Sequence, residues 1–220
     1  HGGLLPGVAT HNSRLQPCCN FVAGRAKGEY LLFLHGDTEV INREWLEEML
    51  MHAQRAQVGA VGAMLYYPND IIQHAGALIM RERIAVRHAF AGVKRGELGY
   101  MGRLCYAQNL SAVSGACLLV KRSLWKEMGG YDESYESCCH DYDLCMRLRR
   151  QGMLIVWTPF AEMYHHLQRP EKKKRRNKSL EKIQERDMRL FASKWKEELS
   201  RGDPYYNPNF SQFWGDFTLR

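Results

Sequence analysis

The sequence predicts an α/β domain in which one sheet carries helices on its faces, and two observations lead to this fold class. Short apolar runs that are typical of buried strands alternate with stretches of helical period, in the order helix, strand, helix, strand. The chain has 220 residues, of which 45% are hydrophobic and 25% charged, so it can bury one sizeable core. We therefore expect one domain followed by a tail rather than two domains.

The first part of the chain predicts a helix, a strand, a second helix and a second strand. Residues 23–27 resemble the last turns of a helix, with Gly28 as its C-terminal stop. Residues 30–34, YLLFL, form a short continuous apolar run, which predicts a buried strand. Asn42 is expected to N-cap the next helix, and residues 58–65 predict the second buried strand.

The second part of the chain is less regular. Residues 68–110 contain several glycines and no clear period, so we expect a long, loop-rich segment of the kind that often carries function. Residues 112–120 are apolar, and a short helix is expected from residue 123. Residues 141–151 have helical spacing, and residues 154–157 predict a short strand that is followed by Pro159.

Composition and charge limit the class of protein. No window reaches the ~18 consecutive apolar residues of a membrane span, and residues 1–14 do not predict a signal peptide. The seven cysteines are odd in number and include no CxxC, which indicates reduced thiols. The net charge of +7 is concentrated in a basic run over 169–189, which is either a solvated segment or a surface for phosphate or an anionic membrane. Residues 172–178 contain no aromatic residue, so nucleic-acid binding is disfavoured.

Three polar side chains lie at the ends of predicted elements. Asp37 and His165 each follow a predicted strand, and Asp141 opens a helix. Ligands of α/β sheets bind beyond the carboxyl ends of the strands, so these groups could meet at one edge. A carboxylate and a histidine suit a divalent cation, and Asp141 could act as a general base. Spacing alone equally allows a turn aspartate, a structural histidine and an acid at a helix N-terminus.

Seven segments that occur in order from about residue 12 to the C-terminus resemble family 2 glycosyltransferases. They are Asn20, AKGEYLLFLHGDTEVI (26–41), DIIQHAGALI (70–79), NLSAVSGACLLVKRSLWKEMGGYDE (109–133), HDYDLCMRLRRQG (140–152), TPFAEMYHH (158–166) and DPYYNPNFS (203–211). The resemblance is closest to the bacterial branch that builds surface polysaccharides, including rhamnan-type enzymes. It implies a GT-A fold, which is a Rossmann-like α/β sandwich with a mixed sheet, and the use of nucleotide-diphospho-sugars with Mg²⁺ or Mn²⁺.

The resemblance also implies how the chain is divided. Residues 1–168 would form a partial GT-A catalytic domain, truncated at its N-terminus because the family's first nucleotide-binding strands have no counterpart here. Residues 169–220 would form a basic loop, a helix and a C-terminal helical tail that pack on the same domain. A homodimer could then cover the exposed sheet edge that the missing strands leave.

The segment HGDTE resembles the DxD-type segment of the family. Asp37 matches its last acid and would hold the metal on the donor diphosphate, whereas His35 stands where the family has its first acid or asparagine. Glu39 is the nearest second carboxylate, and Asn20 and Glu39 are expected to contact the donor together with Asp37. His165 matches the metal-ligand histidine of the family.

The segment HDYD resembles the family segment EDVDLCLR and implies that Asp141 is the catalytic base. The implied mechanism is a single inverting displacement, in which Asp141 takes the proton of the attacking acceptor hydroxyl. His140 replaces the preceding glutamate of the family and is expected near the acceptor. Gly115 and Ala116 are expected to line the sugar pocket because glycine permits close backbone approach; a plain buried strand is the alternative.

The resemblance thus implies a metal-dependent inverting transferase of cell-surface polysaccharide synthesis. Its donor would be a UDP- or dTDP-sugar, its acceptor a saccharide or lipid-linked saccharide, and residues 172–176 could clamp phosphate. We expect a cytoplasmic protein with peripheral contact at the inner face of the membrane and no nucleic-acid partner. The alternative is a non-catalytic, degenerate or truncated GT-A module that binds saccharide or a membrane surface, which the substitutions at His35 and His140 favour slightly.

Overall fold

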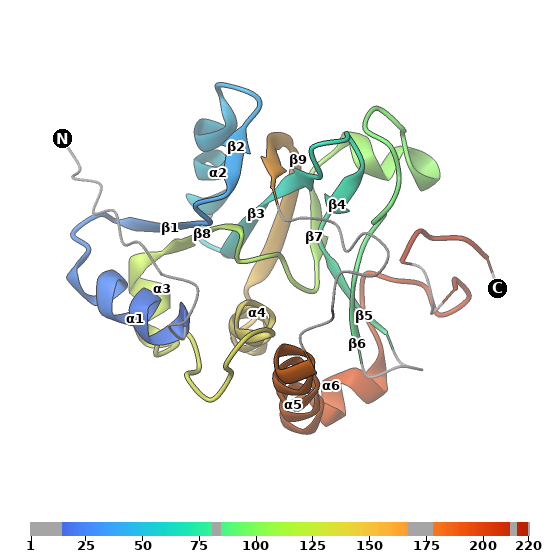
Figure 1. Ribbon diagram of the computed structural model, residues 1–220. Helices are drawn as coiled ribbons and strands as arrows, with labels where there is room; N and C mark the ends of the chain where they lie inside the picture. Colours follow the sequence, from blue (N-terminus) through green and yellow to red (C-terminus); the bar gives the residue numbers. More distant parts are fainter. Residues whose placement is uncertain (1–14, 81–84, 167–177, 212–214, 220) are drawn as a thin grey trace.

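Figure 1 shows the computed structural model, which describes residues 15–80, 85–166, 178–211 and 215–219. The elements in chain order are α1 (Leu15–Arg25), β1 (Tyr30–Leu34), β2 (Thr38–Val40), α2 (Trp45–Ala53), β3 (Val58–Tyr66), β4 (Ile72–His74), β5 (Ala77–Met80), β6 (Ala85–His88), the 3₁₀ helix η1 (Tyr100–Cys105), β7 (Gln108–Leu110), β8 (Cys117–Lys121), α3 (Arg122–Glu127), α4 (His140–Arg150), β9 (Leu154–His165), α5 (Lys178–Lys194) and α6 (Lys196–Arg201).

The main sheet is mixed, as predicted. Its order is β1-β8-β3-β9-β2, with β4 added beside β3 and β7 beside β9. Of the described pairings in this sheet, only that of β3 with β9 is parallel, and the others are antiparallel. The strands β5 and β6 form a separate two-stranded sheet. The central position of β3 explains why all nine of its residues are buried and why it reads as a continuous apolar run.

Helices cover both faces of the main sheet (Figure 1). The helix α2 packs on one face, where Met49 and Ala53 join a buried cluster with side chains of β3, β8 and β9. On the other face, α4 buries Leu144 and Leu148 in the larger core cluster. The helices α5 and α6 lie beyond α4, where Phe191 forms a third buried cluster with residues that include Met146 of α4.

The strand β9 is much longer than the predicted 154–157 strand. It runs to His165 and passes through Pro159 because its pairing with β3 shifts there: Gly62 pairs with Trp157, but Met64 pairs with Glu162. Residues 158–161 therefore form a bulge, in which the sheet needs no hydrogen bond from the backbone nitrogen of the proline.

The predicted N-cap role of Asn42 is wrong. No side-chain hydrogen bond caps α2, whose N-cap residue is Glu44. Asn42 instead serves the bulge of β9: its amide donates to the Phe160 carbonyl at 2.7 Å, and its side-chain oxygen accepts the Glu162 N–H at 2.8 Å. The segment 68–110 also differs from the prediction, since it contains β4, β5, β6, η1 and β7.

The chain after residue 177 packs against the sheet domain. Asp187 of α5 accepts backbone N–H bonds from residues 136, 137 and 138, and Asp203 accepts the N–H of Ile79 at 2.6 Å. The proposed boundary near residue 168 and the basic residues 172–176 lie outside the described residues. Among the helices that the structure describes, none has the length and apolarity needed to cross a membrane.

Candidate active site

The structure brings His35, Asp37 and His165 together at one edge of the sheet. The three ligand atoms lie within 4.8 Å of one another, and among the residues that the structure describes they are the group with the composition of a metal site. His165 Nε2 lies 3.2 Å from Asp37 Oδ1 and 3.3 Å from His35 Nδ1. The pairing of β2 with β9 explains this meeting, because it sets Thr38 opposite His165.

The electrostatics of His165 fit a bound cation. His165 is 3% exposed, and its Nδ1 donates a hydrogen bond of 2.7 Å to the side-chain oxygen of Gln73. Burial lowers the pKa of His165, and the nearby Asp37 carboxylate only partly offsets this effect. A neutral ring with the proton on Nδ1 directs the lone pair of Nε2 at a carboxylate oxygen, which is favourable when a cation or a proton lies between them.

The turn that carries His35 and Asp37 is fixed from both sides. The His35 N–H donates to the Ala116 carbonyl at 2.9 Å, and the Thr38 hydroxyl donates to the His35 carbonyl at 2.6 Å. On the other side, the His166 N–H donates to the Asp37 carbonyl at 2.8 Å. Asp37 is 47% exposed, so its carboxylate is open to solvent although its backbone is held.

Asp141 lies in the first turn of α4 and is held by backbone donors. The Gly115 N–H donates to Asp141 Oδ2 at 2.8 Å, and the Tyr142 N–H donates to Oδ1 at 2.9 Å. A Cβ atom on residue 115 would lie 3.2 Å from Asp141 Cβ and 3.4 Å from both Asp141 Oδ2 and the Tyr131 hydroxyl. The close approach therefore depends on the glycine.

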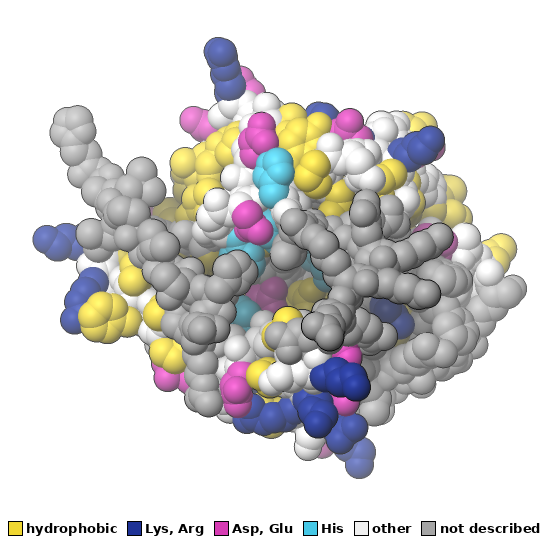
Figure 2. Space-filling view, in the orientation of Figure 1, with side chains coloured by type: hydrophobic (Ala, Val, Ile, Leu, Met, Phe, Trp, Pro, Cys, Tyr) yellow, Lys and Arg dark blue, Asp and Glu magenta, His cyan; other side chains and the backbone are white. Residues whose placement is uncertain are grey.

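The segment 114–116 connects the two halves of the site. Gly115 holds the Asp141 carboxylate, and its neighbour Ala116 holds the backbone of His35. Figure 2 shows acidic and histidine side chains in a line that leads from the β2 side of this face into a hollow at its centre.

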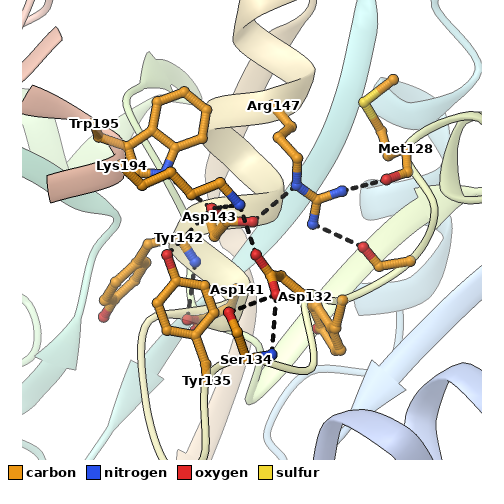
Figure 3. Close-up of polar contacts among 12 residues, drawn as sticks. Met128, Asp132, Ser134, Tyr135, Asp141, Tyr142, Asp143, Arg147, Lys194 and Trp195 are labelled. Carbon is orange, nitrogen blue, oxygen red and sulfur yellow. Dashed lines mark hydrogen bonds and ion pairs between the residues drawn. The ribbon is translucent and has the colours of Figure 1, made fainter. Parts of the chain in front are cut away.

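A buried ionic network fixes the start of α4 (Figure 3). Asp143 is fully buried. Its carboxylate lies 2.8 Å from both Arg147 Nε and Lys194 Nζ, and it accepts a hydrogen bond of 2.9 Å from the Trp195 indole N–H. Arg147 also donates to the carbonyls of Met128 and Gly130. The network joins α4 to α5 and to the loop before α4, so the helix that carries Asp141 has little freedom to shift.

The other predicted site residues have internal partners. The Asn20 amide is bonded to both the N–H and the carbonyl of Tyr131, and also to Glu133. Glu39 pairs with His166 at 2.9 Å and is not part of the three-residue cluster. The donor-binding roles of Asn20 and Glu39 therefore stay predictions.

Two predicted pocket residues are buried. His140 is 7% exposed, and its Nδ1 accepts a hydrogen bond of 2.9 Å from the amide of Gln16 in α1. The Ala116 side chain is 1% exposed and packs in the core, although its carbonyl holds the HGD turn. The roles of His140 and Ala116 as pocket side chains stay predictions.

Two features of the site were not predicted from the sequence. The sequence indicates only that His35 replaces an acid, whereas in the structure its Nδ1 lies 3.3 Å from His165 Nε2. Gln73 was not singled out, because a single glutamine in a loop-rich segment gives no signal before β4 is known. An imidazole at a position where oxygen ligands are common indicates a metal ligand, since imidazole nitrogens and carboxylate oxygens both bind metals.

Two solved structures have a similar fold. GalNAc-T7 in complex with UDP, GalNAc and Mn²⁺ has a TM-score of 0.59 at 14% identity, over 83% of this chain and 36% of that chain. The mannosyltransferase PcManGT of Pyrobaculum calidifontis, in complex with GDP-Man and Mn²⁺, has a TM-score of 0.53 at 13% identity, over 86% of this chain and 44% of that chain. At such low identity, these likenesses show the GT-A fold alone.

Curated relatives share more of the sequence. An O-antigen biosynthesis protein, RfbC of Myxococcus xanthus, is 36% identical over 203 residues, which is 91% of this chain and 15% of the relative. An uncharacterized protein of Sinorhizobium fredii is 38% identical over 208 residues, or 91% of this chain and 22% of the relative. An N-acetylglucosaminyl-diphospho-decaprenol L-rhamnosyltransferase of Mycobacterium tuberculosis is 48% identical over 54 residues, or 24% of this chain and 18% of the relative.

The chain spans less than a quarter of the length of these relatives. The sequence profile described as "Glycosyltransferase like family 2" matches residues 9–189, which is most of the chain. This match confirms the family that the seven segments resemble, and the fold agrees with it. The chain belongs to the family 2 glycosyltransferases.

Proposed function

We propose that this chain transfers a sugar, with inversion, from a nucleotide-diphospho-sugar to a hydroxyl of a saccharide or lipid-linked acceptor in the synthesis of a cell-surface polysaccharide. One observation carries the proposal. Adjacent residues of one segment hold the two parts that such a transfer needs: Gly115 holds the Asp141 carboxylate, and Ala116 holds the turn of His35 and Asp37.

Asp141 is the proposed base. Its two backbone hydrogen bonds fix the orientation of the carboxylate, and an ionised carboxylate has about four lone-pair sites, so acceptor capacity remains for a substrate hydroxyl. The carboxylate takes the hydroxyl proton as the oxygen attacks the anomeric carbon in line with the leaving diphosphate. The Asp143 network keeps the carboxylate in place during this step.

His35, Asp37 and His165 are the residues that would hold the divalent cation. A bound Mg²⁺ or Mn²⁺ supplies neutralisation of the charge that develops on the leaving diphosphate. The chain's own contribution is to hold Asp37 open to solvent and to present Nε2 of a neutral His165 beside it. We propose His35 as the third protein ligand, because its Nδ1 faces the same point.

The comparisons support the substrate class. The curated relatives include proteins named for O-antigen biosynthesis and for rhamnosyl transfer, and the two similar structures contain UDP or GDP-Man with Mn²⁺. These names support a nucleotide-diphospho-sugar as the donor. Within this class we propose a UDP- or dTDP-sugar. Peripheral contact with the inner face of the membrane is part of the proposal only because a lipid-linked acceptor would lie there.

The test compares the chain with an Asp141→Asn variant. Release of nucleoside diphosphate from a panel of UDP- and dTDP-sugars is measured with Mn²⁺, and the anomeric configuration of any transfer product is read by NMR. We expect the wild-type chain to release diphosphate, and Asp141→Asn to bind the donor as before but to lose at least about 100-fold in rate. A variant as active as the wild type, or a product of retained configuration, would refute the assignment of the base.

A further inference from the structure

The strand β4 contains two buried polar residues that the proposed function does not use. Gln73 is 7% exposed and His74 is 1% exposed, and both side chains are hydrogen-bonded to other parts of the site. Burial of a polar group costs free energy unless the group is hydrogen-bonded. Two such residues in a three-residue strand therefore indicate that their hydrogen bonds have a function.

The first of these bonds orients His165. Gln73 Oε1 can only accept, so the 2.7 Å contact requires the proton of His165 to be on Nδ1. This tautomer leaves Nε2 as the free nitrogen, and Nε2 is the atom that faces Asp37 and His35. Groups that bond to the far nitrogen of a ligand histidine in this way fix its orientation.

The main chain of the same residue connects to the helix of the base. The Gln73 carbonyl accepts a hydrogen bond of 2.9 Å from His88 Nδ1. His88 Nε2 therefore has the lone pair, and the Tyr142 hydroxyl donates to it at 2.7 Å. Tyr142 directly follows Asp141, and its own N–H holds the Asp141 carboxylate.

The neighbouring histidine makes a second connection to the base. His74 Nε2 accepts the Ser114 N–H at 3.0 Å, and Ser114 precedes the glycine that holds Asp141. The rings of His74 and His88 also meet edge to face at 4.7 Å between centroids. Through β4, the metal cluster and the base are thus joined by two short chains of bonds.

We infer that Gln73 is a positioning residue, which sets His165 for the cation through its side chain and ties the cluster to Asp141 through its carbonyl, His88 and Tyr142. The inference rests on the proposed function, since it concerns the cation and the base that are proposed there. Removal of such a bond behind a ligand histidine typically costs about 10- to 100-fold in metal affinity.

The first test measures Mn²⁺ affinity by electron paramagnetic resonance of the free ion. Gln73→Met keeps the size of the side chain but removes the acceptor, so we expect affinity to fall at least about 10-fold. Gln73→Glu restores an acceptor and should recover the affinity. Gln108→Met is the matched control: Gln108 of β7 donates to the Arg103 carbonyl, outside the cluster, so its substitution should leave affinity unchanged.

The second test reads the tautomer directly and needs no metal. In protein labelled with ¹⁵N-histidine, two-bond nitrogen–proton correlations report which nitrogen of His165 carries the proton, and a His165→Gln spectrum identifies its signals. We expect the Nδ1–H tautomer in the wild type and a mixture in a folded Gln73→Met variant. Tyr142→Phe should shift the Nε2 signal of His88 and leave His165 unchanged.

The outcomes separate this inference from the function on which it rests. Wild-type protein that binds no Mn²⁺ would contradict the proposed metal site, while the NMR test would still decide the role of Gln73. Wild-type protein that binds Mn²⁺, together with a Gln73→Met variant of equal affinity and unchanged tautomer, would overturn the inference alone. If Gln73→Met does not fold, the wild-type tautomer decides: a proton on Nε2 of His165 overturns the inference.

Discussion

Replacement of Gly115 by alanine should disturb the base without removing it. The new Cβ would lie 3.2 Å from Asp141 Cβ and 3.4 Å from the Tyr131 hydroxyl, so one neighbour must move by a few tenths of an ångström. Tyr131 is backed by the rings of Trp125 and His140, and α4 is fixed by the Asp143 network. The displacement therefore falls on the 2.8 Å bond between the Gly115 N–H and Asp141 Oδ2.

A hydrogen bond to a charged group contributes about 1.5–3 kcal/mol, which corresponds to a fall of about 10- to 100-fold in kcat if the bond orients the base. Overpacking should also lower stability by about 1–2 kcal/mol. The assay measures diphosphate release at saturating donor and Mn²⁺. The Mn²⁺ affinity is measured in parallel and should stay within about twofold of the wild-type value, since the side chains of the metal ligands are unchanged.

Gly24→Ala is the matched control for this substitution. Gly24 lies in α1, and a Cβ there would meet nothing within 4 Å, so the rate should be unchanged and stability equal or higher by up to about 1 kcal/mol. A folded Gly115→Ala protein with the wild-type rate would contradict this prediction, because the close approach at residue 115 would then have no part in holding the base.

Three further predictions concern acid, the buried network and the metal. Burial lowers the pKa of four histidines in the folded protein. Below about pH 6.5 the unfolded chain therefore binds more protons than the folded chain. Each of the four histidines can then lower the free energy of unfolding by up to about 1.4 kcal/mol per pH unit as the pH falls. Their positions are His74, His88, His140 and His165. Thermal melts should show a constant Tm above that pH and a falling Tm below it, and a Tm that rises on acidification would contradict this. Asp143→Ala leaves Arg147 and Lys194 without their buried partner and should lower the free energy of unfolding by about 3 kcal/mol, or Tm by about 6–12 °C. Glu197→Ala at an exposed pair should change Tm by less than about 2 °C. The two imidazoles of the cluster should make Mn²⁺ bind at least about 10-fold tighter than Mg²⁺ in a competition titration, and equal affinities would count against a His-Asp-His site.

The strand β3 could be predicted from the sequence because it is buried on both faces. The prediction that β1 is buried was wrong: β1 lies at the edge of the sheet, and of its five residues only Leu31 is buried. The runs that became β1 and β3 are continuous and apolar, and a strand of this kind is visible in a single sequence. The strand β9 was predicted too short because Pro159 resembles a stop. The bulge that accommodates the proline depends on the partner strand, and Asn42 stabilises it from a distant position in the chain.

The meeting of Asp37 and His165 could be predicted from the sequence, whereas the contacts that neighbouring groups make with them could not. Asp37 and His165 were singled out correctly as groups that meet at one edge, but their meeting depends on the pairing of β2 with β9. The contribution of Gln73 could not be predicted, because glutamine at a buried position acquires its meaning only from the nitrogen that it faces. The carbonyl of Ala116 is a similar case, since backbone groups leave no trace in a sequence.

The proposed metal-dependent binding of the donor is tested most directly by calorimetry on the full chain and on its Asp37→Ala variant. UDP- and dTDP-sugars are titrated with and without Mn²⁺, and Gly24→Ala serves as the folded control. We expect binding that requires Mn²⁺ and is lost in Asp37→Ala, because the donor diphosphate and the HGD turn would share the cation. Donor binding that is unchanged by Mn²⁺ or by loss of the Asp37 carboxylate would contradict this expectation.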